Sequence, residues 1–111
     1  MEFITSEELA SSNDQNLLVV DIRDEDTYKM GHVKDSLQVD VYGDIKIGNR
    51  DVVKERLSSL PKDKTIITVC NVGMTAQKAT AILEEMGYKS KVLEGGMMKW
   101  AETQPVEMDD F

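Results

Sequence analysis

Residues 65–76 read Thr65-Ile66-Ile67-Thr68-Val69-Cys70-Asn71-Val72-Gly73-Met74-Thr75-Ala76, an uncharged stretch that contains the only cysteine of the chain. Residues 65–69 are rich in β-branched side chains, which is typical of a strand buried on both faces of a parallel sheet. From residue 76 to residue 86 apolar side chains recur at helical spacing, and Gly87 is a natural stop. Cys70 is therefore predicted at the carboxyl end of a strand, just before a helix amino terminus, where unpaired N–H groups stabilise a thiolate.

A free cysteine is more often a small buried hydrophobic residue than a nucleophile. Three features favour a functional Cys70. It is predicted at the carboxyl edge of a parallel strand, where open α/β sheets bind ligands; Gly73 permits tight curvature of the backbone; and a helix follows at once. From these residues alone, the structural and the functional interpretation both remain open.

The composition describes one globular domain of 111 residues, with 41% hydrophobic and 31% charged residues. Its longest apolar stretch is too short and too polar to cross a bilayer. Met1 is followed by Glu2 without a basic segment, so no secretory signal is expected. A single cysteine cannot form an intrachain disulfide, which favours a reducing compartment, and we expect a cytoplasmic protein.

The charge of the chain limits the kinds of partner it can bind. A net charge of −8 argues against nucleic acid and against an anionic membrane. The acidity suits either solubility alone or a basic partner protein. One histidine and one cysteine do not make a zinc-ligand set of the usual kind, so no metal is expected.

Hydrophobic patterns along the chain predict strands that alternate with helices, which is typical of a parallel α/β sheet with helices on both faces. Residues 41–50 are the least readable part and are expected to form a connection, and residues 105–111 a flexible tail. The predicted strands cover residues 17–22, 37–39, 65–69 and 89–93, and the predicted helices residues 5–10, 24–30, 51–60, 76–86 and 97–102.

Asp21 and His32 are candidates for acid-base chemistry, but each has a simpler interpretation. Asp21 is expected to accept hydrogen bonds from loop amides at the end of its strand. His32 follows a different strand from Cys70, and nothing in the sequence places the two together. We interpret His32 as a turn histidine bonded to the backbone.

Three motifs, in the same order and spacing, resemble those of single-domain rhodaneses. Asp21-Ile22-Arg23, Tyr28 and Gly31-His32-Val33 resemble the opening motif D-[VI]-R…[YF]-x-x-G-H-[IV]. Cys70-Asn71-Val72-Gly73 resembles the C-x-x-G loop of that family, and Leu93-Glu94-Gly95-Gly96 with Trp100 and Pro105-Val106 resembles the closing L-x-G-G-x-x-x-W…P-V. Asp35 stands where the family often has glycine, which affects the turn after His32.

The resemblance implies a single rhodanese domain over residues 1–111, with a parallel sheet of about five short strands. It implies a sulfurtransferase in which Cys70 takes a sulfane sulfur as a persulfide and passes it to a thiophilic acceptor such as a thiol or cyanide. No metal or organic cofactor is implied, and Asp21, Arg23 and His32 are mainly architectural. The cradle around the outer sulfur would be formed by the backbone of Asn71, Val72, Gly73, Met74 and Thr75.

The loop from Cys70 to Thr75 also indicates which sulfur donor to expect. Its six-residue length matches sulfur-transferring rhodaneses, whereas related phosphatases have a longer loop that ends in arginine. Many rhodaneses carry basic residues where this chain has Asn71 and Thr75. Without these cations we expect poor use of thiosulfate and a preference for polysulfide, a low-molecular-weight persulfide or a partner protein's persulfide. Met74, with Met97 and Met98, would give the mouth an apolar rim.

A second class of function stays open beside sulfur transfer. The missing loop cations and the acidic surface also suit a rhodanese-fold binding or regulatory module whose cysteine is not catalytic. Rapid alkylation of Cys70 at neutral pH would favour the enzyme, and a slow, ordinary thiol would favour the binding module.

Overall fold

The structure is a computed structural model that describes residues 1–109. Its five strands form one sheet in the order β1-β5-β4-β2-β3, and every neighbouring pair is parallel. The α/β architecture predicted from the alternation of strands and helices is confirmed. The elements are β1 (Glu2–Ile4), α1 (Ser6–Ser11), β2 (Leu17–Asp21), α2 (Glu25–Met30), β3 (Leu37–Gln38), α3 (Tyr42–Lys46), α4 (Arg50–Leu57), β4 (Thr65–Val69), α5 (Met74–Glu85), β5 (Lys89–Leu93) and α6 (Gly96–Thr103).

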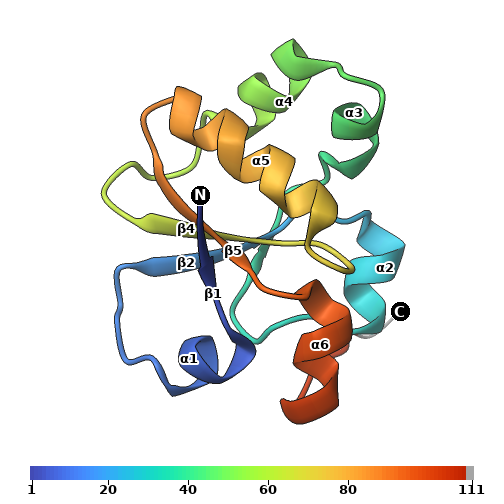
Figure 1. Ribbon diagram of the computed structural model, residues 1–111. Coiled ribbons are helices and arrows are strands. Elements are labelled where there is room, and N and C mark those ends of the chain that lie inside the picture. Colours follow the sequence, from blue (N-terminus) through green and yellow to red (C-terminus); the bar gives the residue numbers. More distant parts are fainter. Residues whose placement is uncertain (110–111) are drawn as a thin grey trace.

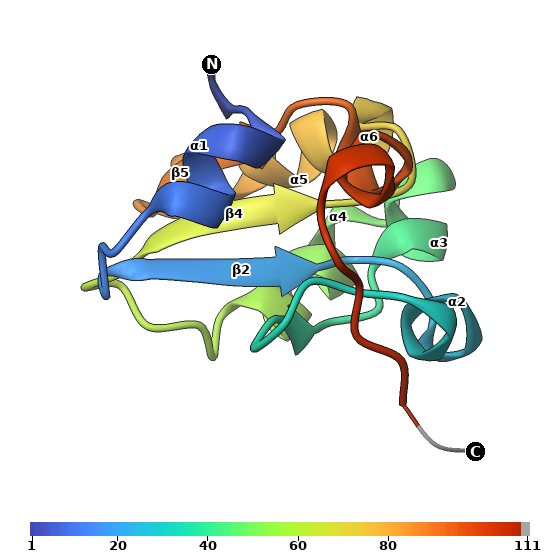
Figure 2. The ribbon, with the colours of Figure 1, turned by 90° about the horizontal axis from the view of Figure 1, so that it is seen from below.

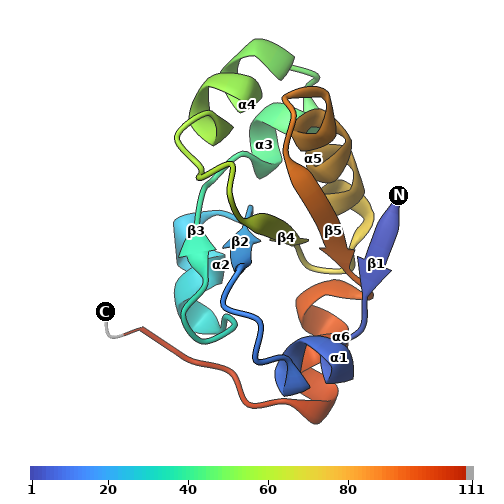
Figure 3. The same ribbon diagram turned by 90° about the vertical axis from the view of Figure 1, so that its left-hand side faces the viewer.

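Helices cover both faces of the sheet. Figure 3 shows α3, α4 and α5 on one side of the strands and α1 and α6 on the other. In Figure 2 the arrows of β2 and β4 point toward the end of the molecule where α2 and α6 lie. The carboxyl ends of the two strands therefore open onto the region between these helices.

Each face of the sheet has its own hydrophobic core, and β4 contributes to both. Ile66 packs with Ala79 and Leu83 of α5 in one core, while Ile67 packs with Trp100 of α6 in the other. Ile66, Ile67 and Val69 are fully buried. This burial confirms the prediction that residues 65–69 form a strand enclosed on both faces.

Two short elements were not predicted from the sequence. β1 is an edge strand that pairs with β5, and only Ile4 of its three residues is buried. α3 lies in the stretch 41–50 that we expected to be a connection; it spans five residues, contains Gly43 and buries only Ile45. Neither segment is long enough to show a hydrophobic period, so its structure comes from packing against the rest of the chain.

The turn after His32 contains a residue with an unusual backbone conformation. Asp35 has a φ of 64°, and it is the only residue other than glycine with a positive φ in the part of the chain described. Aspartate tolerates the left-handed region better than most residues, but glycine adopts it without steric cost. This φ agrees with the expectation that Asp35 affects the turn after His32.

Residues 105–109 are attached to the domain, which differs from the expected flexible tail over 105–111. Glu107 and His32 exchange two backbone hydrogen bonds of 2.9 Å, and the Asp109 N–H donates to the Lys29 carbonyl. The indole of Trp100 donates to the carbonyl of Pro105. Figure 1 shows this segment passing beside α2. Residues 110 and 111, the rest of the predicted tail, lie outside the described residues.

A membrane-spanning helix is not found among residues 1–109, because each helix there is too short or too polar to cross a bilayer.

Candidate active site

Cys70 lies where the central strand of the sheet ends. β4 pairs with β2 on one side and with β5 on the other, so both flanks of the strand are fixed by parallel ladders. Beyond the last paired residue, Ile22 donates its N–H to the carbonyl of Val69. The side chain that follows is held at the carboxyl edge of the sheet, where α/β folds place their ligands. Cys70 is only 1% exposed.

The sulfur of Cys70 accepts two backbone hydrogen bonds from the loop and helix that follow it. The N–H groups of Gly73 and Ala76 lie 3.1 Å and 3.3 Å from Sγ. Gly73 is the N-cap of α5 with a φ of +93°, a left-handed conformation that lets the loop turn back over the sulfur. Ala76 belongs to the first turn of that helix, whose N–H groups have no partner within the helix. Both contacts would favour a negative charge on sulfur.

The five predicted cradle residues divide into two groups. Gly73 and Thr75 are buried, whereas the side chains of Asn71, Val72 and Met74 are exposed. None of these residues carries a charge. The predicted cradle thus has a rim of uncharged side chains, and of its five residues Gly73 is the one whose N–H is bonded to Sγ. The donor that the sequence prediction missed is Ala76, because helix α5 begins at Met74 rather than at residue 76.

A glycine turn supports the loop from behind. The N–H groups of Met97 and Met98, at the start of α6, donate to the carbonyls of Cys70 and Asn71 at 2.9 Å each. Gly96 approaches the loop so closely that a Cβ would lie 2.5 Å from the Cys70 carbonyl oxygen. The sequence analysis did not predict that this turn positions the cysteine loop. The feature that could have indicated this role is the pair Gly95-Gly96 immediately before a helix.

Three buried hydroxyl groups connect α5 to the sheet beneath it. The hydroxyl of Thr80 lies 2.9 Å from that of Thr68 in β4 and 2.8 Å from that of Ser90 in β5. Ser90 in turn donates to the carbonyl of Ile66. Buried hydroxyls that are all hydrogen-bonded fix one arrangement of the packed elements. These hydrogen bonds fix the middle of α5 against β4 and β5.

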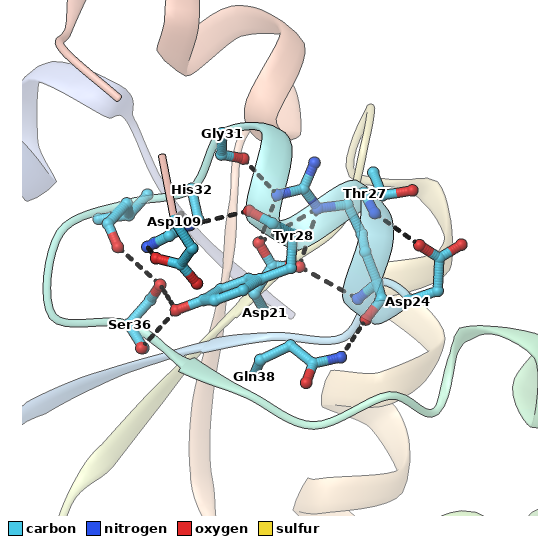
Figure 4. Close-up of polar contacts among 11 residues, drawn as sticks. Asp21, Asp24, Thr27, Tyr28, Gly31, His32, Ser36, Gln38 and Asp109 are labelled. Atoms are coloured by element: carbon cyan, nitrogen blue, oxygen red, sulfur yellow. Dashed lines mark hydrogen bonds and ion pairs between the residues drawn. The ribbon is translucent and has the colours of Figure 1, made fainter. Parts of the chain in front are cut away.

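Asp21 and Arg23 form a buried ion pair beside the site. The Nε and Nη2 groups of Arg23 donate to the Asp21 carboxylate at 2.7–3.1 Å, and Nη2 also reaches the carbonyl of Gly31. Asp21 accepts the Arg23 backbone N–H as well, as expected for a residue that orders its loop. Figure 4 shows Asp21 between Gly31 and Gln38. The arrangement is that of a structural ion pair.

His32 is fixed by neighbours in its own turn. Its Nδ1 lies 2.8 Å from the Tyr28 carbonyl oxygen, and its ring stacks on that of Tyr28 with centroids 3.9 Å apart. On the other side Nε2 lies 3.5 Å from a carboxylate oxygen of Asp109 (Figure 4). The prediction of a turn histidine bonded to the backbone is confirmed.

Three shifted pKa values around α2 have simple causes. Burial raises the pKa of the Tyr28 phenol above its usual value. Hydrogen bonds from Thr27 lower the pKa of Asp24, the N-cap of α2. Glu25, which pairs with Lys29 at 3.0 Å, raises the pKa of that lysine. Each of these three shifts favours the ordinary charge state of its group at neutral pH.

A metal centre is not indicated by the side chains. Within residues 1–109, no group of three or more His, Cys, Asp or Glu side chains is placed to hold a metal ion. The groups seen at the site are the Cys70 sulfur and the backbone N–H groups of Gly73 and Ala76 that contact it.

Residues 5–103 match the rhodanese-like domain family. The chain belongs to this family. A sulfurtransferase of Allochromatium vinosum is 31% identical over 97 residues, covering 86% of this chain and 80% of the relative. The thiosulfate sulfurtransferase GlpE of Pseudomonas fluorescens (strain SBW25) is 30% identical over 106 residues, covering 95% and 89%. These relatives support membership of a sulfurtransferase family.

Solved structures show the same rhodanese-like fold. The BH2092 protein of Bacillus halodurans superposes with a TM-score of 0.77 at 27% identity, covering 96% of this chain and 77% of the other. A rhodanese-like domain protein of Staphylococcus aureus gives a TM-score of 0.79 at 24% identity, covering 99% and 100%. The match extends over almost all of the sheet and helices described above, as the resemblance implied.

Proposed function

We propose that this chain is a sulfurtransferase in which Cys70 carries a sulfane sulfur as a persulfide. The observation that supports this most directly is the pair of backbone N–H groups, from Gly73 and Ala76, that point at Sγ. They stabilise the thiolate needed for attack on a sulfur donor. They do so in a buried position, where hydrogen bonds to charge are strongest.

The first half-reaction is a displacement at sulfur. The Cys70 thiolate attacks the sulfane sulfur of the donor, an S–S bond forms to Sγ, and the donor's own S–S bond breaks. The leaving group, a shortened polysulfide or a thiolate, takes the electron pair. The new outer sulfur is anionic, and the backbone of the loop from Asn71 to Thr75 is the cradle that would surround it.

The second half-reaction returns Cys70 to its starting state. A thiol or cyanide acceptor attacks the outer sulfur, and Sγ leaves as a thiolate stabilised by the same two N–H groups. No external oxidant or reductant is needed: transfer to a thiolate exchanges one S–S bond for another, and in transfer to cyanide the sulfane sulfur is reduced as the cyanide carbon is oxidised. The chain needs no redox partner for the cycle.

The uncharged loop determines the proposed donor. Thiosulfate is a dianion whose sulfonate needs cationic or strongly polarised donors. Between Cys70 and Ala76 the loop offers only backbone N–H groups and uncharged side chains. Each missing charge-assisted hydrogen bond is worth about 1.5–3 kcal/mol. We therefore propose polysulfide or an organic persulfide as the preferred donor.

Intact mass spectrometry tests this function directly. After brief incubation with polysulfide, the chain should gain about 32 Da per sulfur, and cyanide should remove the gain as thiocyanate. Thiosulfate at the same concentration should load much less. The Cys70→Ser variant is the matched control and should gain nothing. If folded wild-type chain fails to load from either donor, the persulfide-carrier proposal is wrong and a non-catalytic binding module is the better description.

A further inference from the structure

Exposed apolar side chains are concentrated around the end of the molecule that carries Cys70. Met30 at the end of α2 and Met98 in α6 are 67% and 66% exposed, and Met74 in the cradle is 68% exposed. Contiguous exposed apolar surface is unusual on a monomeric protein and marks interaction sites. Methionine is especially suited to such surfaces because its side chain is flexible and polarisable.

Between these elements lies a groove that we call the methionine groove. It has a volume of about 430 Å³, and its apolar lining comes from Met30, Met97, Met98, Ala101 and Val106. Asn71, the first cradle residue after Cys70, also lines it. The carbonyl of Asn71 is bonded to the Met98 N–H, so the groove borders the loop that would carry the transferred sulfur.

Arg23 adds hydrogen-bond donors to the groove. Its side chain is 6% exposed, and Nε and Nη2 are occupied by Asp21 and Gly31. No described residue accepts a hydrogen bond from Nη1, although Arg23 lines the groove. Nη1 is not among the fully enclosed unpartnered atoms of the described residues, so its N–H groups reach the accessible surface of the groove. The two left on Nη1 suit a neutral acceptor such as a peptide carbonyl, because the cation is already neutralised by Asp21.

The segments that border the groove are acidic. Residues 24–32 and 94–109 together contain seven acidic and two basic side chains, a net charge of −5 out of the chain's −8. The two lysines, Lys29 and Lys99, already lie beside Glu25 and Glu94. This field favours contact with a basic surface over contact with an acidic one.

We infer that the methionine groove docks a basic, apolar segment of a partner protein whose cysteine exchanges sulfur with Cys70. Apolar side chains of the segment would cover Met30 and Met98, a main-chain carbonyl would accept from Arg23 Nη1, and flanking Lys or Arg side chains would face the acidic border. The inference rests on the proposed persulfide chemistry for the identity of the reaction, while the docking itself is independent of that chemistry.

The exchange balances without a further reactant. The partner's thiolate attacks the outer sulfur of the Cys70 persulfide, a new S–S bond forms on the partner, and the bond between the outer sulfur and Sγ breaks. Sγ keeps the electron pair as a thiolate, and any proton on the outer sulfur moves with it. The reverse exchange would load Cys70 from a partner persulfide.

Binding is tested with peptides that lack a thiol. Fluorescein-Lys-Leu-Gly-Ser-Val-Leu-Arg-amide and its counterpart with Glu at both charged positions are titrated with the full chain, and anisotropy is recorded. The basic peptide should bind more tightly than the acidic one. The double variant Met30→Ser/Met98→Ser should weaken its binding about tenfold through lost apolar contact. Ile47→Ser is the matched control, since Ile47, the C-cap residue after α3, is 77% exposed and lies outside the groove.

Equal binding of the two peptides, or equal binding by the double variant and by wild type, would overturn the docking inference. A dimer in sedimentation velocity that the double variant abolishes would also overturn it, because the groove would then belong to a second copy of this chain. In the transfer assay, the Cys-containing form of the basic peptide should take sulfur from loaded Cys70 faster than free cysteine does. Peptide binding without any loading of Cys70 would instead reject the persulfide function and leave the docking surface established.

Discussion

Gly96 and Cys70 lie in direct backbone contact, with space for a hydrogen but not for a methyl group between them. A Cβ on Gly96 would come within 2.5 Å of the Cys70 carbonyl oxygen and 2.6 Å of the Asn71 carbonyl oxygen. The φ of Gly96 is also positive, at 61°. The shape of the cysteine loop therefore depends on the absence of a side chain in a distant turn.

Replacing Gly96 with alanine should damage both stability and sulfur loading. The added methyl group would overlap two carbonyl oxygens, and alanine would have to adopt a left-handed backbone conformation at this position. We therefore expect the free energy of unfolding to fall by about 2–4 kcal/mol. Urea unfolding measures this loss, and intact mass after polysulfide treatment measures loading of the fraction that stays folded. Gly43→Ala is the control, because nothing lies within 4 Å of its Cβ position in α3. Wild-type loading and stability in Gly96→Ala would show that the turn does not shape the loop.

Adding a cation to the cradle should improve the use of thiosulfate. Asn71 is exposed, so Asn71→Arg can place a guanidinium at the mouth without burying it. One charge-assisted hydrogen bond of about 1.5–3 kcal/mol corresponds to roughly 10–150-fold faster loading from thiosulfate. Loading from polysulfide should change much less. The rates are compared by quenched mass spectrometry, with Asn71→Gln as the uncharged control. No gain with arginine would mean that the missing charge does not limit thiosulfate use.

Substitutions at Asp35 should follow the cost of its left-handed backbone. Glycine removes the steric cost but adds freedom to the unfolded chain, so Asp35→Gly should be as stable as wild type or up to about 1 kcal/mol more stable. Asp35→Val should lose about 1–2 kcal/mol, since a β-branched residue is least tolerant of positive φ. Thermal melts rank the three proteins. Valine ranking above aspartate would contradict the observed φ of 64°.

The capping box of α1 predicts a pH-dependent contribution to stability. The backbone N–H of Thr5 donates to the Glu8 carboxylate at 2.9 Å, and this bond lowers the pKa of Glu8 below its ordinary 4.5. A carboxyl whose pKa is lower in the folded state stabilises the fold above its unfolded-state pKa. This contribution disappears as the pH falls through the lower, folded-state pKa. Glu8→Gln should therefore melt below wild type at pH 7, and the gap should narrow by pH 3. The control is Glu7→Gln, because the Glu7 carboxylate makes no hydrogen bond in the described chain. The difference in melting temperature between Glu7→Gln and wild type should be the same at pH 7 and at pH 3.

Local patterns were sufficient to predict the strand, loop and helix that contain Cys70. The strand was indicated by five consecutive uncharged residues, and the helix by apolar side chains that recur at helical spacing after the loop. Both patterns reflect burial, and β4 and α5 are observed at these places. The same is true of the hydrogen bond that Asp21 accepts from the Arg23 N–H and of the contact between His32 Nδ1 and the Tyr28 carbonyl, because these partners lie within a few residues along the chain. Contacts between residues that are close in sequence can therefore be predicted from local sequence patterns.

Features that depend on distant segments were not predictable in the same way. The N–H groups of Met97 and Met98 support the loop only because β5 and the glycine turn bring α6 to it, and no period encodes that approach. Likewise, β1 forms a strand because its backbone pairs with the edge of β5. The segment 105–109 is held in place because His32 pairs with Glu107. Each depends on a partner whose position follows from the whole fold.

The support of the cysteine loop by α6 also has a consequence for the order in which the protein is made. A ribosome adds Cys70 well before it adds Gly96, Met97 and Met98. Until those residues emerge, the nascent chain contains the thiol but lacks the N–H groups that hold the Cys70 and Asn71 carbonyls, and it lacks the β5 neighbour of β4. The shaped loop can form only once nearly the whole domain has been synthesised, so its sulfur chemistry would begin as one of the last steps of maturation.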